Sequence, residues 1–194
     1  MQRMGQGDRD AFAELFRLHQ ATVFRFARQM SGSRDVAEDI TQDVFVALLR
    51  QADRFDPRRA SLTTYLYGIS RNLVLRRLRP RSGQATLDLD DVDHGRTPAL
   101  VVESDPPTDI DRASDLARLR RRMLALPLRH REVIVLCELH ELTYEEAARV
   151  VRCPVGTIRS RLNRARRALI EQCHADAPHT GVGQHERAGR RCLA

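Results

Sequence analysis

The sequence has no lysine and no tryptophan, and aromatic side chains make up only 5% of its 194 residues. So few aromatic side chains argue against an aromatic-rich β-sheet core. Apolar stretches are also short: Val133–Cys137, for example, falls far below the roughly 18 residues that a membrane-spanning helix needs. The segment Met1–Asp10 contains no apolar core of signal-peptide length. We therefore expect a cytoplasmic protein without membrane insertion.

Cysteine is scarce, and its spacing is not that of a metal or dithiol site. The four cysteines lie far apart and form no Cys-x-x-Cys pair: Cys137, Cys153, Cys173 and Cys192. We therefore expect reduced thiols, as is usual in the cytosol. One alternative is a metal-dependent enzyme or sensor with ligands near the C-terminus, although their spacing fits no standard pattern: Cys173, His174, His179, His185 and Cys192. The chain also lacks a nucleophile motif, an acid–base pair and a Gly-rich phosphate loop, so we predict no catalytic residue, no metal and no cofactor.

Positive charge is abundant and comes from a single residue type. All 33 basic residues are arginine, and the formal net charge is +7. The planar guanidinium group can bind phosphates and the edge of guanine in a bidentate way, which indicates a polyanionic partner. A GC-rich genome would by itself replace lysine with arginine, so the clustering of the arginines carries more weight than their number.

The periodicity of apolar residues predicts an all-α fold with two small helical domains joined by a flexible linker. Helical spacing runs from Asp10 to about Arg79, with a break at Gly32 and a candidate N-cap at Ser33. The pattern fails in an acidic, Pro-containing stretch and returns from Leu116. The predicted boundaries are 1–80 for an N-terminal helical bundle, 81–112 for the linker, 113–174 for a C-terminal helix-turn-helix domain and 175–194 for a disordered tail.

The strongest local signal is a helix-turn-helix near the end of the second domain. Thr143 and Glu146 form a capping box that starts one helix, and Pro154 is well placed to start the next. The second helix buries apolar residues at spacings of 3 and 4, which turns a polar set outward: Arg159, Ser160, Asn163 and Arg164. These side chains are candidates for contacts with base edges, while Arg161, Arg166 and Arg167 suit phosphates or intramolecular ion pairs.

The segments Leu142–Ala148 and Cys153–Arg166 resemble the C-terminal domain of ECF (extracytoplasmic-function) sigma factors. In that family the domain reads the minus-thirty-five promoter element. The resemblance implies that the base contacts fall on Arg159, Ser160, Asn163 and Arg164. We expect the DNA-binding set to include Pro154, Thr157 and Arg167 as well. Arg152 departs from the family, which usually has Gly in this turn, so Arg152 must adopt a left-handed or near-helical conformation at some cost.

Two segments of the N-terminal half resemble the same family. Val36–Phe45 is similar to its polymerase-binding helix, and the exposed residues that would meet polymerase are Glu38, Asp39, Gln42 and Asp43. An ordinary solvated helix face is the alternative. Ser61–Leu73 and the arginines after it are similar to the family's minus-ten-reading segment, which implies contacts by Tyr65, Tyr67, Arg71, Asn72, Arg76 and Arg77. Tyr65 stands where the family usually has Trp, and core packing is an equal alternative for its ring.

Taken together, these resemblances predict a non-enzymatic transcription initiation factor. Its expected partners are core RNA polymerase and promoter DNA, and an anti-sigma factor is also expected because members of this family commonly have one. The alternative is a conventional helix-turn-helix regulator that never joins polymerase. That protein would bind duplex DNA tightly on its own and would have no need for the acidic face between Glu38 and Asp43.

Overall fold

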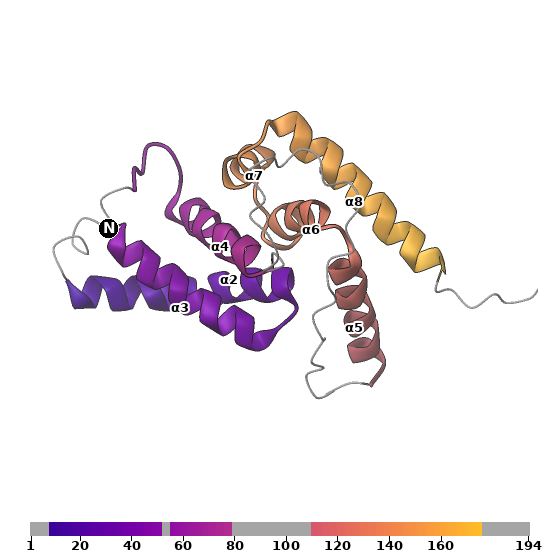
Figure 1. The fold of residues 1–194 in the computed structure, drawn as a ribbon, viewed down its shortest axis with the longest axis horizontal. Coiled ribbons are helices and arrows are strands. Elements are labelled where there is room, and N and C mark those ends of the chain that lie inside the picture. The colour runs from indigo at the N-terminus through magenta and orange to yellow at the C-terminus, as the bar shows by residue number, and fades with distance from the viewer. Residues whose placement is uncertain (1–7, 52–54, 79–109, 176–194) are drawn as a thin grey trace, which may run out of the picture.

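The computed structural model describes residues 8–51, 55–78 and 110–175, and within these ranges every regular element is a helix. The N-terminal half contains α2 (Arg9–Ser31), α3 (Arg34–Arg50) and α4 (Leu62–Leu78). The C-terminal half contains α5 (Ile110–Ala125), α6 (Leu128–Ile134), the π-helical turn η2 (Val135–Leu139), α7 (Tyr144–Val151) and α8 (Val155–Ala175). Figure 1 shows the two groups of helices side by side. The prediction of an all-α fold with two helical domains is confirmed.

The break between α2 and α3 falls at Gly32 and Ser33, where the sequence predicted it, whereas α3 ends at Arg50, before the Phe55–Pro57 stretch expected to end it. Gly32 ends α2 in the left-handed conformation, with φ 78°, and its N–H donates to the carbonyl of Arg28. Ser33 adopts the extended conformation of an N-cap, and its hydroxyl accepts from the N–H of Val36 at 3.4 Å. A hydroxyl that accepts at this position satisfies one of the amide groups that a helix start leaves unpaired.

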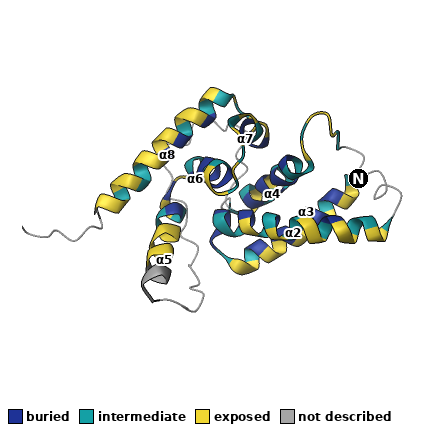
Figure 2. Ribbon diagram, turned by 180° about the vertical axis from the view of Figure 1, so that it is seen from behind, coloured by how far each residue is buried: buried dark blue, intermediate teal, exposed yellow. Residues whose placement is uncertain are grey.

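The three N-terminal helices pack into a bundle around an apolar core. Seven of the residues that the periodicity placed inside are buried: Leu15, Val23, Ala27, Ile40, Val44, Leu48 and Leu66. The largest fully buried side chains include two that the pattern did not select, Phe26 and Met30. Figure 2 shows the buried residues concentrated where α2, α3 and α4 face one another and the C-terminal helices.

The first helix of the C-terminal half begins just before the predicted start of the C-terminal domain. The helix α5 starts at Ile110, three residues before the predicted boundary at 113. The rest of the predicted linker, 81–109, lies outside the described residues, as does the predicted tail from 176 onward. None of the described helices is both long enough and apolar enough to cross a membrane.

The C-terminal domain is built around α6 and α8. The residues that α6, α7 and α8 bury include Val133, Val150, Ile158, Leu162 and Ala165. Between α6 and α7 the chain passes through η2, whose wider turn ends at His140. Such π-helical turns are often found at functional positions, because they turn a side chain in a direction that a regular helix does not offer.

Candidate functional site

The helix-turn-helix forms through the signals that the sequence contains. Thr143 accepts from the N–H of Glu146 at 3.2 Å, and the N–H of Thr143 donates to the Glu146 carboxylate at 3.0 Å. This reciprocal capping box begins α7 and is the one that the sequence predicted. Pro154 precedes α8, and the N–H of Thr157 donates to its carbonyl at 2.9 Å. The two helices therefore meet in a short turn.

Arg152 adopts the strained conformation that the sequence required of it. Its φ is 62° and its ψ is 48°, which is the left-handed region. Its N–H donates to the carbonyl of Ala148 at 2.8 Å, so the backbone geometry ends α7 as a glycine would. Glycine would adopt this backbone conformation at no steric cost, whereas the Cβ of Arg152 makes it unfavourable.

The outward face of α8 is polar and basic, as predicted. Ile158, Leu162 and Ala165 are buried to 1% exposure or less and attach the helix to its domain. The predicted base-contacting side chains all lie on the exposed side: Arg159, Ser160, Asn163 and Arg164. Pro154 and Arg167 are also exposed, and Thr157 is half-exposed. No acidic residue occurs between Pro154 and Ile170, so no carboxylate on this part of α8 opposes an approaching phosphate.

Two arginines of α8 are already paired with acidic residues of the same domain. Arg161 lies 3.7 Å from the carboxylate of Glu132, and Arg166 forms an ion pair with Glu138. The sequence had suggested intramolecular pairing as one of two roles for these arginines. The guanidinium of Arg159 lies over the ring of Tyr144, 5.8 Å from its centroid. This cation–π contact positions Arg159, the first of the predicted base-contacting arginines, relative to α7.

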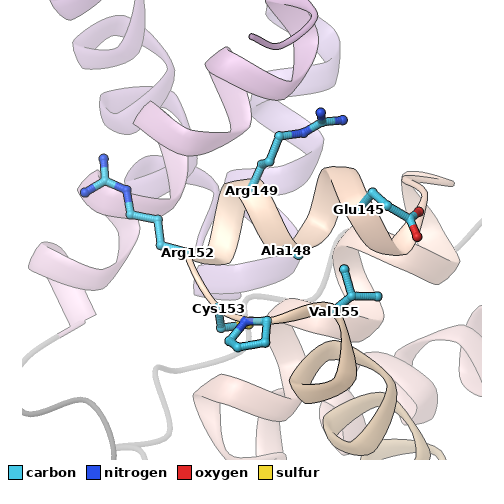
Figure 3. Close-up of a pocket in the computed structure, with 7 residues that line it drawn as sticks. Glu145, Ala148, Arg149, Arg152, Cys153 and Val155 are labelled. Carbon is cyan, nitrogen blue, oxygen red and sulfur yellow. The ribbon is translucent and has the colours of Figure 1, made fainter.

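A shallow depression of about 530 Å³ follows the turn between α7 and α8. It is lined by Glu145, Ala148, Arg149, Arg152, Cys153, Pro154 and Val155. Figure 3 shows Arg149 and Arg152 extending from α7 and the turn, away from α8. Sequence reasoning did not select these two arginines as binding residues.

The acidic set on α3 is exposed as a group. Glu38, Asp39, Gln42 and Asp43 all lie on the outer face, while Ile40 and Val44 between them are buried. Asp39 forms an exposed ion pair with Arg77 of α4, at 3.1 Å. Exposed pairs of this kind contribute little to stability and can exchange for other partners. The face is therefore available to a partner that carries positive charge.

The predicted minus-ten residues on α4 divide into two groups. Asn72, Arg76 and Arg77 are exposed, and Tyr65 is half-buried with its ring centroid 5.4 Å from that of Phe55. Tyr67 and Arg71 are instead buried, with 3% and 6% of their surfaces exposed.

Both buried residues contact the C-terminal domain: Tyr67 contacts His140, and Arg71 pairs with Glu132. Sequence reasoning did not identify His140 or Glu132. No signal in the local pattern indicated that another domain covers part of α4.

The residues of the alternative metal site are not organised by the described part of the chain. Cys173 and His174 lie exposed near the end of α8, and the other three candidates fall outside the described residues. Among the described residues no group of three or more potential ligands comes together. Burial raises the pKa of the Cys137 and Cys153 thiols, so neither is activated as a nucleophile.

A helix-turn-helix with a basic recognition helix, joined to a second helical bundle with an acidic outer face, defines a DNA-binding transcription factor. Comparison with known proteins narrows this class. The family model described as Sigma-70 region 2 matches residues 15–83, and the one described as Sigma-70, region 4 matches residues 116–169.

Similar proteins of known sequence or structure match this chain over most of its length. The ECF RNA polymerase sigma factor SigW of Bacillus subtilis is 31% identical over 176 residues, which cover 89% of this chain and 94% of SigW. CnrH, solved in complex with the cytosolic domain of CnrY, superposes with a TM-score of 0.66 and 25% identity over 90% of this chain and 95% of CnrH. The sigma factor RpoE of Bartonella quintana, solved with the anti-sigma factor NepR, superposes with a TM-score of 0.66 and 27% identity, covering 86% of this chain and 98% of RpoE.

The chain belongs to the ECF family of RNA polymerase sigma factors. It is a transcription initiation factor that binds core RNA polymerase and directs transcription from specific promoters. Membership in a family of RNA polymerase sigma factors, with matches in both halves of the chain, decides against the alternative of a regulator that never joins polymerase.

Proposed function

We propose that α8 reads the minus-thirty-five element in the major groove. The observation that carries this assignment is the division of α8, from Val155 to Ile170, into a buried apolar stripe and an exposed set without acidic residues. Arg159, Asn163 and Arg164 present donors in the geometry that suits guanine and adenine edges. Each good bidentate contact discriminates against a wrong base by about 1–3 kcal/mol. The paired Arg161 and Arg166 hold α8 in place from within the domain.

The exposed part of α4 then captures the melted minus-ten strand. Asn72 offers a polar edge for an unstacked base, and Arg76 and Arg77 lie one turn further along the same helix for phosphates. Tyr65 rests on Phe55, which holds its ring in one orientation as a stacking platform. Tyr67 and Arg71 join this set only when the two domains separate, because the C-terminal domain covers them in the arrangement described above.

The acidic face of α3 docks on core RNA polymerase. In a protein with a net charge of +7, a surface made of Glu38, Asp39, Gln42 and Asp43 is unsuited to DNA and suited to a basic protein surface. Catalysis belongs to the polymerase, and this chain contributes binding energy for positioning and strand opening. A factor of this kind acts where the polymerase acts, in the cytoplasm.

An anti-sigma factor is the third proposed partner. The similarity to RpoE, which was solved in complex with the anti-sigma factor NepR, supports this assignment. Such a partner would hold the chain away from polymerase until a signal releases it.

The experiment that tests these assignments is transcription reconstituted from the purified chain, bacterial core polymerase and a library of promoter fragments. We compare the native chain with a triple variant carrying Asp39→Ala, Gln42→Ala and Asp43→Ala. Specific transcripts should appear with the native chain and disappear with the variant, because the variant can no longer dock. Sequencing the transcribed promoters would define the two elements that α4 and α8 read.

A matched control carries Asp10→Ala, Glu14→Ala and Gln20→Ala on α2, which removes the same number of acidic and amide side chains from another helix. It should transcribe as the native chain does. Equal activity of both triple variants would refute the role of the α3 face. An Asn163→Ala, Arg164→Ala variant should still bind core polymerase but lose its preference among minus-thirty-five sequences. An unchanged preference would refute the role of α8.

A further inference from the structure

The guanidinium group of Arg159 is held by an aromatic ring. Its central carbon lies over the ring of Tyr144, 5.8 Å from the ring centroid. Arg159 is exposed on α8, whereas Tyr144 is half-buried at the first position of α7. A cation within about 6 Å of the centroid of an aromatic ring is attracted to the face of that ring. The contact therefore restrains a side chain that would otherwise sample many rotamers in water.

The side chain of Tyr144 is itself fixed at both of its ends. At the backbone end, the capping box between Thr143 and Glu146 sets the first turn of α7, and the ring packs against the buried core. At the other end lies Arg166, which forms an ion pair with Glu138 of η2. Hydrogen bonding and charge from Glu138, with a smaller contribution from Tyr144, raise the pKa of Arg166. The ring is thus a rigid support for Arg159.

The arginines of α8 are held in two different ways. Arg161 and Arg166 face the carboxylates of Glu132 and Glu138, whose oxygens are acceptors for their N–H groups. Arg159 faces a ring instead, which attracts the cation without offering a carboxylate oxygen. The N–H donors of Arg159 therefore stay available for another acceptor. A side chain that is oriented and still has its donors available is suited to the O6 and N7 acceptors of a guanine in the major groove.

Tyr144 lies beside one edge of the recognition helix. Arg159 and Arg166 are seven residues apart, which is about two helical turns, so they lie on the same side of α8. Arg164, the other arginine in the predicted base-contacting set, lies five residues after Arg159 and is rotated by about 140° around the helix axis. Any effect of the ring should therefore fall on the base pair that Arg159 contacts and not on the whole element.

We propose that Tyr144 is a positioning residue for promoter recognition, whose ring aims the guanidinium group of Arg159 at one base pair of the minus-thirty-five element. The proposal rests on the proposed reading of that element by α8. Tyr144 acts through Arg159 and does not itself select a base. Without the ring, Arg159 samples other rotamers and contacts phosphates as readily as base edges, so the preference at its base pair falls.

Four full-length chains test this proposal, each as a holoenzyme with bacterial core polymerase: native, Arg159→Ala, Tyr144→Leu and Tyr144→Phe. The templates are a promoter that the native chain transcribes and copies in which each base pair of its minus-thirty-five element is changed in turn. The preference at a base pair is the ratio of transcripts from the native base pair to transcripts from the changed one. Tyr144→Phe is the matched control, because it keeps the aromatic face and removes only the hydroxyl.

Arg159→Ala should lower the preference by about tenfold at one base pair, which identifies the position that Arg159 reads. Tyr144→Leu should lower the preference at that same base pair by about threefold to fivefold, as expected for loss of an exposed cation–π contact. Tyr144→Phe should keep the native preference. Adding Tyr144→Leu to Arg159→Ala should cause no further loss, since the two residues act as one unit.

A measurement on the free chain checks the contact without DNA. The Nε–Hε signal of Arg159 in NMR spectra is assigned by its disappearance in Arg159→Lys. Because ring electrons shield protons above an aromatic face, this signal should move downfield in Tyr144→Leu and stay in place in Tyr144→Phe. Circular dichroism verifies that each variant is folded. If Tyr144→Leu does not fold, Tyr144→Met, whose flexible side chain adapts to irregular packing, is measured in its place with the same expectations.

A folded Tyr144→Leu variant with the native preference at every base pair would overturn the proposal. So would an equal loss in Tyr144→Phe, or an Arg159 signal that does not move. A further loss when Tyr144→Leu is added to Arg159→Ala would show that Tyr144 contacts DNA itself, which also overturns it. Failure of the proposed function is distinguishable: Arg159→Ala would then change the preference at no base pair, and the proposal would fall with it, although the NMR signal still reported the contact with Tyr144.

Discussion

The hydroxyl of Tyr67 lies 2.6 Å from Nδ1 of His140, although the two residues are 73 positions apart in the sequence. On the other side of the ring, Oε1 of Gln29 can only accept a hydrogen bond, so Nε2 of the neutral imidazole carries the hydrogen. Nδ1 is then free to accept from Tyr67. The ring of Phe26 packs edge-on against both Tyr67 and His140, with centroids 5.4 and 5.9 Å away. The contact between Tyr67 and His140 therefore depends both on a neutral imidazole protonated at Nε2 and on apolar packing by Phe26.

This arrangement makes the stability of the protein depend on pH. Burial, and to a lesser extent the charge of Arg25, lower the pKa of His140 from 6.5 to about 4. A lowered pKa means that the folded protein prefers the neutral ring, so its contribution is complete above pH 6.5 and is lost as the pH falls towards 4. We expect the free energy of unfolding, measured with urea, to decrease over this range.

Substitution of His140 by Gln isolates this effect from the titration of carboxylates. Glutamine is neutral at every pH used, so the variant should lose less stability than the native chain between pH 6.5 and 4. The test compares how the free energy of unfolding changes with pH in the variant and in the native chain. Parallel curves would show that His140 is not the group responsible.

Of the three glycines in the described part of the chain, Gly32 is the one where an added methyl group should be most damaging. Its φ is +78°, and an added Cβ would lie 2.7 Å from Cδ1 of Leu124 in α5. We expect Gly32→Ala to lower the free energy of unfolding by about 1–3 kcal/mol, since a left-handed backbone and a close contact between α2 and α5 both oppose the side chain. Chemical denaturation of the full-length chain measures the change.

Gly68 provides the matched control for that substitution. It lies inside α4, and an added Cβ would meet nothing within 4 Å. Because alanine favours a helix interior over glycine, Gly68→Ala should raise the free energy of unfolding by about 0.5–1 kcal/mol. If the two alanine variants changed stability in the same direction, the role assigned to the Gly32 backbone and to Leu124 would be wrong.

Replacing Arg152 by glycine should raise the free energy of unfolding. Its backbone is left-handed, with φ 62° and ψ 48°, and glycine adopts that conformation without a Cβ penalty. Arg152→Gly is therefore expected to stabilise the protein by about 0.5–1 kcal/mol in urea denaturation. Arg149→Gly, three residues earlier and within α7, should instead destabilise it by about 1 kcal/mol. If both variants were less stable than the native chain, the conclusion that the backbone of Arg152 is strained would be wrong.

Local features of the structure could be predicted because their physical causes lie within a few neighbouring residues. The capping box of Thr143 and Glu146 and the N-cap at Ser33 depend on side chains that reach backbone groups one turn away. The exposed face of α8 follows from apolar residues spaced three and four apart. For this reason the helix-turn-helix, its outward residues and the acidic face of α3 were all identified from the sequence pattern.

Other features depend on how the two domains meet. Phe26 and Met30 are fully buried although the periodicity did not select them, because they lie where α2 faces the C-terminal domain. The burial of Tyr67 and Arg71 requires contacts with His140 and Glu132, more than 60 positions away. A helical pattern shows which side of α4 faces its own bundle, but it does not show what covers the opposite side.

The sequence by itself determined the helices, their ends, the membership of both halves in the sigma factor family and the residues that face outward on α3 and α8. The tertiary structure alone decided that two of the residues predicted to contact the minus-ten strand, Tyr67 and Arg71, are buried and that the carboxylate of Glu132 pairs with Arg71. The physical reason is the range of the forces involved. Capping and amphipathicity act along one helix, whereas the pairing of Arg71 with Glu132 exists only when two separately encoded surfaces exclude water from the same place.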